Sequence, residues 1–382
     1  MKTLLLPGFQ YQSDQASKIL SELQVDHKIF SGSPPKSFND PSKVDFIPLP
    51  FKILNRIIGL PRPKRLKELD TFLYRKAAST KVSAMEYDFL HGWASFSLDA
   101  FVKAKELSNS TLFLERACPH IFVQEDILRP EYEFFGLPAN ENSKKLLEVM
   151  IAEYEMADFI IVPSTYTKDS FEGYGLSHKV VVATLSGNNF TQPKYLTQKR
   201  TFTVGAIGGN VIRKGFIYLL QAWAKAGLKN SKLVLRTSHE ELKKIPKISA
   251  ALNNCRDVEI ISYLPNVSCF FDELDLMILP SIDEGYGMVV EEALSAGVPT
   301  SVSTNVGSKD RVKETGAGSI FPIRDVEYLA NVLKAEHARF EESSIDEINN
   351  RRYLISERSQ SREKANDYST TLRTLYREGW AP

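Results

Sequence analysis

The sequence predicts an α/β protein built from two doubly wound domains, in which parallel strands alternate with helices. Short apolar runs such as KTLLLPG, ADFIIVPS and KVVVATLSG alternate with charged segments of helical period such as SKKLLEVMIAEYEMA, which is the pattern of β-α-β units. A length of 382 residues fits two domains of ordinary size. The series of strands and helices also starts again after NNFTQPKYLTQKR, a polar stretch with a proline, which we interpret as the linker.

Composition narrows the classes of function. Lys and Arg number 48 against 47 Asp and Glu, so no net charge attracts nucleic acid and we expect no nucleic-acid partner. The three cysteines, Cys118, Cys255 and Cys269, show no C-x-x-C spacing, which argues against a disulfide framework or a zinc site and favours a reducing compartment. The apolar run at residues 4–6 is too short for an export signal, and no run of about 18 apolar residues occurs. We therefore expect a cytoplasmic protein.

The first predicted domain covers residues 1–190. Its strands are expected in KTLLLPG at the start, in STLFLER near residue 113, in ADFIIVPS near 160 and in KVVVATLSG near 182. The stretch YDFLHGWASFSLDAF (87–101) places His91 at the end of a short apolar run. The carboxyl end of a parallel strand is the ligand side of such a sheet, which makes His91 a candidate site residue. A lone histidine is more often structural, and His120, after the next strand, is the competing candidate.

The segment FKILNRIIGLPRPKRLKEL (51–69) mixes apolar side chains with lysines and arginines. A basic and apolar segment can lie on an anionic membrane surface, so peripheral membrane contact through residues 51–69 is one hypothesis. The alternative is a solvated loop or a helix packed on the core, because a moderate helical moment is common in soluble proteins.

The second predicted domain covers residues 198–355. TFTVGAIGG is expected to be a strand and turn, FIYLLQAWAKAG a helix, and SKLVLRTS, VEIISYLP, LDLMILPS and PTSVST further strands or strand ends. The remaining residues, 356–382, are charged and helix-prone, and we expect this C-terminal helix to pack back on the N-terminal domain through Tyr376 and Trp380.

The stretch SIDEGYGMVVEEALSAGVPTSVS (281–303) follows a strand and opens a helix. Gly285 and Gly287 let the backbone bend and approach a ligand closely. A helix that begins near Met288 offers free N–H groups and a dipole to an anion such as a diphosphate. Glu292 then lies about 6 Å further along the axis and can accept hydrogen bonds from vicinal hydroxyls. Acids near helix N-termini are common, so spacing alone leaves function and helix stabilisation equally open for Glu284 and Glu292.

The order P-S-x-x-E-G-Y-G-M-V-V-E-E-A-L-S-A-G-V-P over residues 280–299 resembles the glutamate-seven-glutamate signature of retaining glycosyltransferases with the GT-B fold, the group 1 or family 4-like enzymes. The resemblance implies two Rossmann-like domains that face a central cleft. It implies that Glu292 binds the donor ribose and that Glu284 lies near the donor sugar as a catalytic residue. It also implies that the turn from Gly285 through Tyr286 and Gly287 to Met288 contacts sugar and phosphate.

The stretch VGAIGGNVIRKGFIYLLQAW (204–223) resembles the opening of the second domain in the same family. The resemblance implies that Arg213 and Lys214 bind the donor diphosphate, although an arbitrary basic pair is more often simply hydrated. Many members carry an arginine about five residues before the lysine, where this chain has Gly209. Arg213 takes that role in our interpretation.

The resemblance is looser in the first domain. PGFQ after the first strand resembles a shortened form of the family's first glycine loop, and only Gly8 is carried over as a donor-binding residue. The family also has a histidine or an acid near the donor sugar in the region of His91, which favours His91 as the second catalytic candidate.

The resemblance implies a retaining glycosyltransferase of the hexosyltransferase type with a UDP- or GDP-linked sugar as donor, and a role in polysaccharide biosynthesis fits it. The acceptor is a glycan, a lipid-linked glycan or another hydroxyl compound. Because two cations and a helix dipole can neutralise the leaving diphosphate and no D-x-D motif occupies a suitable turn, we predict that no metal and no other cofactor is needed. A sugar-nucleotide epimerase or a phosphorylase of the same shape, and a non-catalytic binder, remain alternatives.

Overall fold

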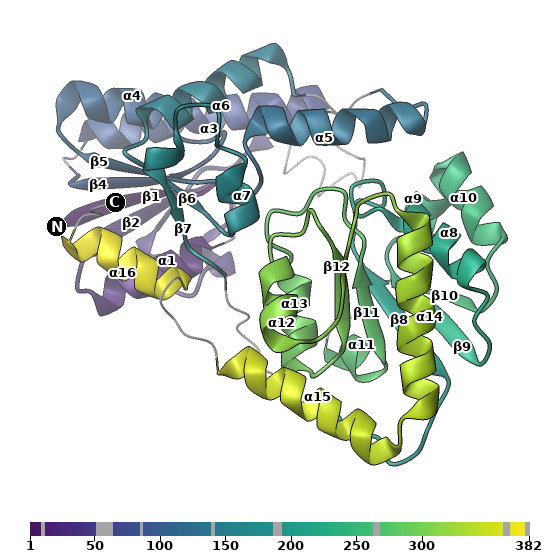
Figure 1. The fold of residues 1–382 in the computed structure, drawn as a ribbon. Helices are drawn as coiled ribbons and strands as arrows, with labels where there is room; N and C mark the ends of the chain where they lie inside the picture. The colour runs from purple at the N-terminus through teal and green to yellow at the C-terminus, as the bar shows by residue number, and fades with distance from the viewer. Residues whose placement is uncertain are drawn as a thin grey trace. The chain divides into compact units, whose positions relative to one another are not determined.

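The computed structural model describes residues 1–8, 12–50, 64–84, 87–138, 142–185, 193–262, 268–361 and 367–378. The chain forms two compact units, each with one parallel sheet between layers of helices (Figure 1). The first unit comprises residues 1–121, 142–184 and 365–382, and the second comprises residues 122–141 and 185–364. The predicted fold class, two doubly wound α/β domains, is confirmed.

The first sheet has seven strands in the order β3-β2-β1-β4-β5-β6-β7, all parallel. These strands are β1 (Lys2–Leu6), β2 (Asp26–Ser31), β3 (Val44–Phe46), β4 (Phe89–Trp93), β5 (Thr111–Glu115), β6 (Phe159–Val162) and β7 (Val180–Val182). The helices of the first unit are α1 (Ser13–Glu22), α3 (Lys64–Ala84), α4 (Leu98–Leu107), α6 (Lys144–Met156), α7 (Thr165–Asp169) and α16 (Tyr368–Glu378), with short 3-10 turns at η1 (Pro35–Ser37), η2 (Pro41–Lys43) and η3 (Ser177–Lys179).

The second sheet has six parallel strands in the order β10-β9-β8-β11-β12-β13. These strands are β8 (Phe202–Ile207), β9 (Ser231–Arg236), β10 (Val258–Ile261), β11 (Leu276–Leu279), β12 (Thr300–Ser303) and β13 (Ile320–Phe321). The helices are α5 (Ile121–Phe134), α8 (Phe216–Ala226), α9 (His239–Lys244), α10 (Pro246–Asn253), α11 (Ser268–Asp272), α12 (Met288–Ser295), α13 (Lys309–Thr315), α14 (Val326–Glu342) and α15 (Ile345–Gln360).

The central strands of both sheets are apolar because helices cover both of their faces. Every residue of β8 and of β11 is buried, as expected for a parallel sheet with two covered faces. Gly205 in β8 leaves the space that Leu274 fills, since a Cβ atom there would lie 2.4 Å from a Leu274 methyl group. The apolar runs of the sequence are therefore the strands at the centre of the hydrophobic cores.

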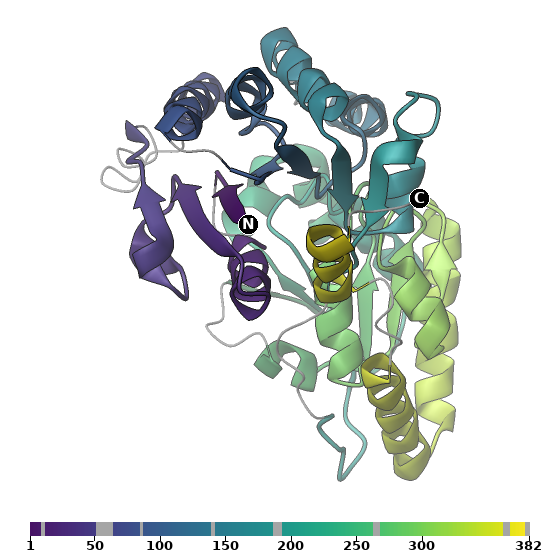
Figure 2. The same ribbon diagram turned by 90° about the vertical axis from the view of Figure 1, so that its left-hand side faces the viewer.

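The C-terminal segment divides between the two units. Helix α15 groups with the second unit, whereas α16 groups with the first unit and lies beside α1 in both views (Figures 1 and 2). The buried side chains of Tyr368, Leu372, Leu375 and Tyr376 hold α16 on the first sheet. Trp380 lies outside the described residues.

Helix α5 follows β5 in the chain but packs with the second unit. The buried carboxylate of Glu131 accepts hydrogen bonds from Tyr218 at 3.0 Å and from Arg324. The predicted ranges, 1–190, 198–355 and 356–382, thus differ from the compact units in residues 122–141 and in the place where the C-terminal segment changes unit. Within the described ranges, no helix is both long enough and apolar enough to cross a membrane.

Candidate functional site

The candidate site lies at the carboxyl ends of β8 and β11, two neighbouring strands of the second sheet. The chain continues outward from β8 through β9 and β10 on one side of this pair, and outward from β11 through β12 and β13 on the other. The pair therefore marks the topological switch point where ligands bind in doubly wound sheets. The loops 208–215 and 280–287 leave the sheet there. The Ile282 N–H donates to the Arg213 carbonyl oxygen at 2.8 Å, which holds the two loops together.

Three charged side chains from these loops converge. The Lys214 ammonium lies 2.5 Å from a carboxylate oxygen of Glu284, and Lys214 is only 9% exposed. The Arg213 guanidinium lies 3.8 Å from the same oxygen and donates to the Asp283 carbonyl oxygen at 3.3 Å. The carboxylate of Glu284 therefore faces two cations, which can also bind an anion.

The loop after β12 braces the turn that carries Glu284. The Glu284 N–H donates to the Asn305 carbonyl oxygen at 3.0 Å, and the Gly307 N–H donates to the Glu284 carbonyl oxygen at 2.9 Å. The Ser308 N–H donates to the Tyr286 carbonyl oxygen at 2.8 Å. Sequence reasoning missed these bracing residues because their contacts are made by backbone atoms, which any residue type supplies.

Two glycines have conformations that the site requires. Gly215 has a φ of +65°, and a Cβ atom there would lie 2.1 Å from the Pro280 carbonyl oxygen. Gly287 caps α12 with a φ of +94°, a region in which side chains other than glycine are strained. Helix α12 begins at Met288, as predicted, so its first N–H groups open toward the turn that holds Gly285.

Glu292 lies in α12 and is half-buried. Burial raises the pKa of the Glu292 carboxyl, and the charge of the Arg236 guanidinium opposes that shift. Arg236 is the last residue of β9, at the same edge of the sheet. Sequence reasoning missed Arg236, although an arginine that ends a buried strand was a usable signal.

The side chains of Tyr286 and Glu291 belong to the packing of α12. The Tyr286 hydroxyl donates to a Glu291 carboxylate oxygen at 2.6 Å, and the Arg311 guanidinium lies 3.0 Å from the same oxygen. All three side chains are buried. The side chain of Tyr286 therefore anchors the helix, and only its backbone is left for the ligand contact that the sequence predicts.

Helix α5 contributes a contact to this site that the sequence does not indicate. The Gln124 amide donates to a carboxylate oxygen of Asp283 at 2.7 Å, and Asp283 is buried next to Glu284. A buried carboxylate needs such donors because its desolvation is costly. The pairing joins positions 159 residues apart, which no local pattern can reveal.

His91 lies within the core of the first unit and is 0% exposed. One ring nitrogen lies 2.8 Å from the Tyr376 hydroxyl and the other 3.1 Å from a Glu115 carboxylate oxygen. The ring also stacks on Trp93 with centroids 4.9 Å apart. This geometry gives His91 a structural role beneath α16, and we do not place it in the candidate site.

The other candidates of the first unit are also packed. The His120 ring is buried and stacks on Tyr174 with centroids 3.7 Å apart. Burial and the charge of Arg116 lower the pKa of His120 to about 4, so the ring is neutral at pH 7. Gly8 makes room for Phe96, because a Cβ atom there would lie 2.2 Å from that ring.

Residues 51–63, which form most of the basic and apolar segment, lie outside the described part of the chain. Across the ranges that the structure does describe, no group of three or more His, Cys, Asp or Glu side chains is arranged to hold a metal ion.

Residues 188–342 match the family model described as "Glycosyl transferases group 1". A curated relative, an uncharacterized glycosyltransferase of Haemophilus influenzae, is 26% identical over 158 residues, which span 40% of this chain and 44% of the relative. The match thus covers less than half the length of that relative.

Solved structures are similar over nearly the whole chain. Sucrose-phosphate synthase from Thermosynechococcus elongatus has a TM-score of 0.70 at 16% identity, with 99% of this chain and 98% of that one covered. Anabaena HepE in complex with UDP and glucose has a TM-score of 0.65 at 17% identity, with 98% of both chains covered. A glycosyltransferase from Rickettsia africae has a TM-score of 0.66 at 13% identity, with 98% and 96% covered. These likenesses show that the fold is GT-B.

Proposed function

We propose that the protein transfers a sugar from a nucleotide-sugar donor to a hydroxyl acceptor. The proposal starts from the match of residues 188–342 to the group 1 glycosyl transferase model and from the GT-B fold of the chain. The observation that carries the proposal is the convergence of Lys214 and Arg213 on Glu284 at the edge where α12 begins. Two cations and a helix N-terminus at a topological switch point suit a diphosphate.

Each part of the donor has a matching group in this site. Lys214, Arg213 and the first N–H groups of α12 bind the diphosphate by charge-assisted hydrogen bonds. Glu292, one helical turn into α12, accepts hydrogen bonds from the ribose hydroxyls. When the diphosphate replaces the Glu284 carboxylate as the partner of the Lys214 ammonium, the Glu284 side chain turns toward the donor sugar. The complex of Anabaena HepE with UDP and glucose supports a uridine nucleotide as the first donor to test.

The reaction proceeds in this proposal with retention of the anomeric configuration. The acceptor oxygen forms a bond to the anomeric carbon on the face from which the nucleotide departs, and the bond from that carbon to the diphosphate oxygen breaks. The acceptor proton passes to a phosphate oxygen of the departing nucleoside diphosphate. Lys214, Arg213 and the α12 N–H groups stabilise the charge that develops on the leaving group.

A nucleotide panel tests donor binding. UDP, GDP, ADP and their glucose conjugates are titrated while thermal unfolding is followed, since a ligand at 100 times its Kd adds about 2.7 kcal/mol to the free energy of unfolding. Lys214→Ala is expected to abolish the response. Lys225→Ala is the matched control, because Lys225 also pairs with a glutamate, Glu327, but on the outer surface of α8. A panel without any response, or an equal response in Lys214→Ala, contradicts the proposal.

Incubation with donor alone separates the transferase from its rivals. An epimerase converts the nucleotide sugar without any acceptor, whereas a transferase requires an acceptor for rapid turnover. A non-catalytic binder is stabilised by the nucleotide but leaves the donor unchanged with every acceptor offered.

The anomeric configuration of the product, read by proton NMR, tests retention. A hexosyl donor, a glycan or lipid-linked acceptor, metal independence, a cytoplasmic location and membrane contact through residues 51–69 stay predictions.

A further inference from the structure

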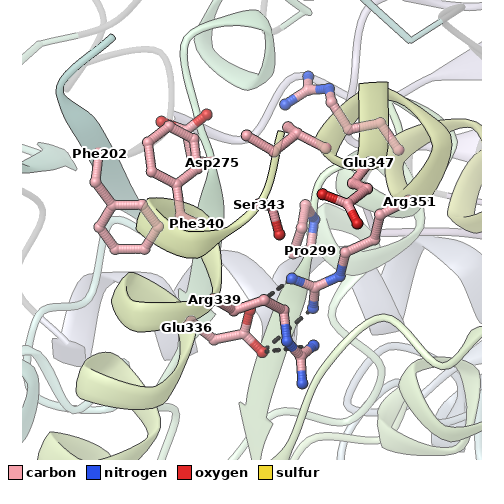
Figure 3. A pocket seen from close by; sticks show the side chains of 11 residues that line it. Phe202, Asp275, Pro299, Glu336, Arg339, Phe340, Ser343, Glu347 and Arg351 are labelled. Atoms are coloured by element: carbon pink, nitrogen blue, oxygen red, sulfur yellow. Dashed lines mark hydrogen bonds and ion pairs between the residues drawn. The ribbon is translucent and has the colours of Figure 1, made fainter. Parts of the chain in front are cut away.

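Buried acids of the second unit are held in two different ways. Near the amino ends of its strands, guanidinium groups hold the carboxylate of Glu336: Arg351 donates to it at 2.7 and 3.2 Å, and Arg339 lies 3.6 Å away (Figure 3). At the carboxyl ends, the buried carboxylate of Asp283 accepts a hydrogen bond at 2.7 Å from the neutral amide of Gln124 in α5. A neutral donor compensates the desolvation of a carboxylate without adding positive charge to the site.

One face of α5 packs on the second unit. Leu128 lies against the hydrophobic core of that unit, and Tyr132 is part of it. Glu131 adds hydrogen bonds from α8 and from the loop after β13. Gln124 lies on the same face, because residues at i, i+4, i+7 and i+8 share one side of a helix. The packing of α5 therefore determines where the Gln124 amide lies.

The same helix contacts both loops that carry the charges of the candidate site. In loop 280–287, Asp283 directly precedes Glu284, and its carbonyl oxygen accepts a hydrogen bond from the Arg213 guanidinium at 3.3 Å. In loop 208–215, the Tyr132 hydroxyl lies 3.5 Å from the side-chain nitrogen of Asn210. The side-chain oxygen of Asn210 in turn accepts from the Arg213 N–H at 3.0 Å. Helix α5 therefore contacts the loop of Glu284 and the loop of Arg213.

We infer that Gln124 is a positioning residue for sugar transfer, because it orients Asp283 beside the groups that bind the donor diphosphate. The inference rests on the proposed function, since it adds a residue to the same site. If the amide is removed, the Asp283 carboxylate loses this donor and lies next to the Arg213 guanidinium, which already bonds to its carbonyl oxygen. A carboxylate that turns to this guanidinium competes with the diphosphate for it, so the donor binds more weakly.

UDP is the probe for the experiment, and its Kd is measured by isothermal calorimetry on the full chain. Gln124→Ala removes the amide, and Gln124→Glu replaces it with a carboxylate of the same shape that repels Asp283. Each variant is expected to weaken the Kd for UDP roughly tenfold or more, the equivalent of one lost hydrogen bond to a charged group. Gln124→Glu combined with Asp283→Asn reverses the pair, so that an amide again donates to a carboxylate. This double variant is expected to regain most of the lost affinity.

Two controls separate positioning from packing and from a general charge effect. Leu128→Ala weakens the packing of α5 but keeps the Gln124 amide, so we expect a lower Tm and an unchanged Kd for UDP. Gln221→Glu makes the same chemical change at an exposed glutamine of α8 and is expected to keep the Kd as well. If Leu128→Ala weakens UDP binding as much as Gln124→Ala does, the effect belongs to packing and the inference is overturned.

Two further results overturn the inference. One is an unchanged Kd in both Gln124→Ala and Gln124→Glu, and the other is a reversed pair that binds UDP no better than Gln124→Glu alone. Failure of the proposed function gives a different result, because the parent chain and Gln221→Glu then bind no nucleotide of the panel, and the inference fails with it. If the parent chain binds another nucleotide of the panel in place of UDP, that nucleotide is the probe.

Discussion

At the scale of single residues, the charged groups of the second unit divide into those that hold the fold and those that remain for a ligand. Glu291 is paired with Arg311 and Tyr286, whereas its neighbour Glu292 is half-buried and interacts electrostatically with Arg236, which ends β9. Adjacent helical positions point about 100° apart, which explains how two consecutive glutamates acquire different roles.

Glu292→Gln tests the assignment of the ribose site. The substitution keeps the shape of the side chain but removes the charge, so UDP binding is expected to lose roughly 1.5–3 kcal/mol, the worth of a charge-assisted hydrogen bond. Calorimetric titration of UDP measures the change. Glu259→Gln, on an exposed carboxylate of β10, is the control. An unchanged affinity in Glu292→Gln would remove Glu292 from the site.

Glu153 makes the stability of the first unit depend on pH. It is fully buried and accepts N–H bonds from Ser95, Ser97 and Leu98, and burial raises the pKa of its carboxyl to about 7 in spite of these bonds. Between pH 4.5 and 7 the folded state therefore binds more protons than the unfolded state. The stability that the protonated Glu153 carboxyl contributes is therefore complete at low pH and is lost as the pH rises through about 7. The free energy of unfolding falls by up to about 1.4 kcal/mol per pH unit in this range.

The pH effect is measured as a difference between variants. His120, with a pKa lowered to about 4, gives a slope of opposite sign in the same range, so urea unfolding of the parent chain alone is not informative. The contribution of Glu153 lowers the free energy of unfolding of the parent chain between pH 5 and 7.5. This contribution is expected to be absent from the pH profile of Glu153→Gln. Glu148→Gln, on the exposed face of the same helix, should retain it. Parallel pH profiles of parent and Glu153→Gln would contradict the assigned pKa.

At the scale of elements, the turn between β8 and α8 depends on how closely it approaches the end of β11. Gly215 and Gly227 cap the two ends of α8 with nearly the same backbone conformation, φ of +65° and +60°. Only Gly215 has a backbone atom in the space of its missing Cβ, the Pro280 carbonyl oxygen, whereas Gly227 has nothing within 4 Å. Alanine variants at the two positions therefore separate the cost of the left-handed backbone conformation from the cost of the clash with the Pro280 carbonyl oxygen.

Gly227→Ala is expected to cost about 1–2 kcal/mol of stability, the strain of a left-handed alanine, and to leave UDP binding intact. Gly215→Ala carries the same strain and must also push the β11 end away from α8, so we expect a larger loss of stability and weaker UDP binding. Chemical denaturation and UDP titration of the two variants measure both effects. Equal losses in the two variants would show that the approach to Pro280 is unimportant.

At the scale of the whole molecule, α16 packs on β4 and β5 of the first sheet, far earlier in the chain. Tyr376 packs against Phe89 and Phe113 and bonds to His91, which is why His91 is buried. The first unit thus depends on residues more than 280 positions away for part of its core.

Tyr376→Ala is expected to destabilise the first unit by about 3–5 kcal/mol, the range for truncating a buried aromatic side chain. Tyr376→Phe keeps the packing and loses only the hydrogen bond to His91, about 1 kcal/mol. Urea unfolding measures both, and Tyr353→Ala, at a tyrosine of α15 that is 47% exposed, is the control. UDP binding by the second unit is expected to persist in all three. A Tyr376→Ala variant as stable as the parent would place α16 outside the core.

The sequence by itself determined the two doubly wound domains and the start of α12 at Met288, which follow from apolar periodicity and from glycines. The assignment of Arg213, Lys214 and Glu284 to one site came from the resemblance to a glycosyltransferase family. Only the tertiary structure decided that His91 is buried beneath α16, that α5 brings Gln124 to Asp283, and that Arg352 is buried. Each of these depends on contacts between residues far apart in the chain, and such contacts are set by the packing of whole elements, on which local patterns carry no information.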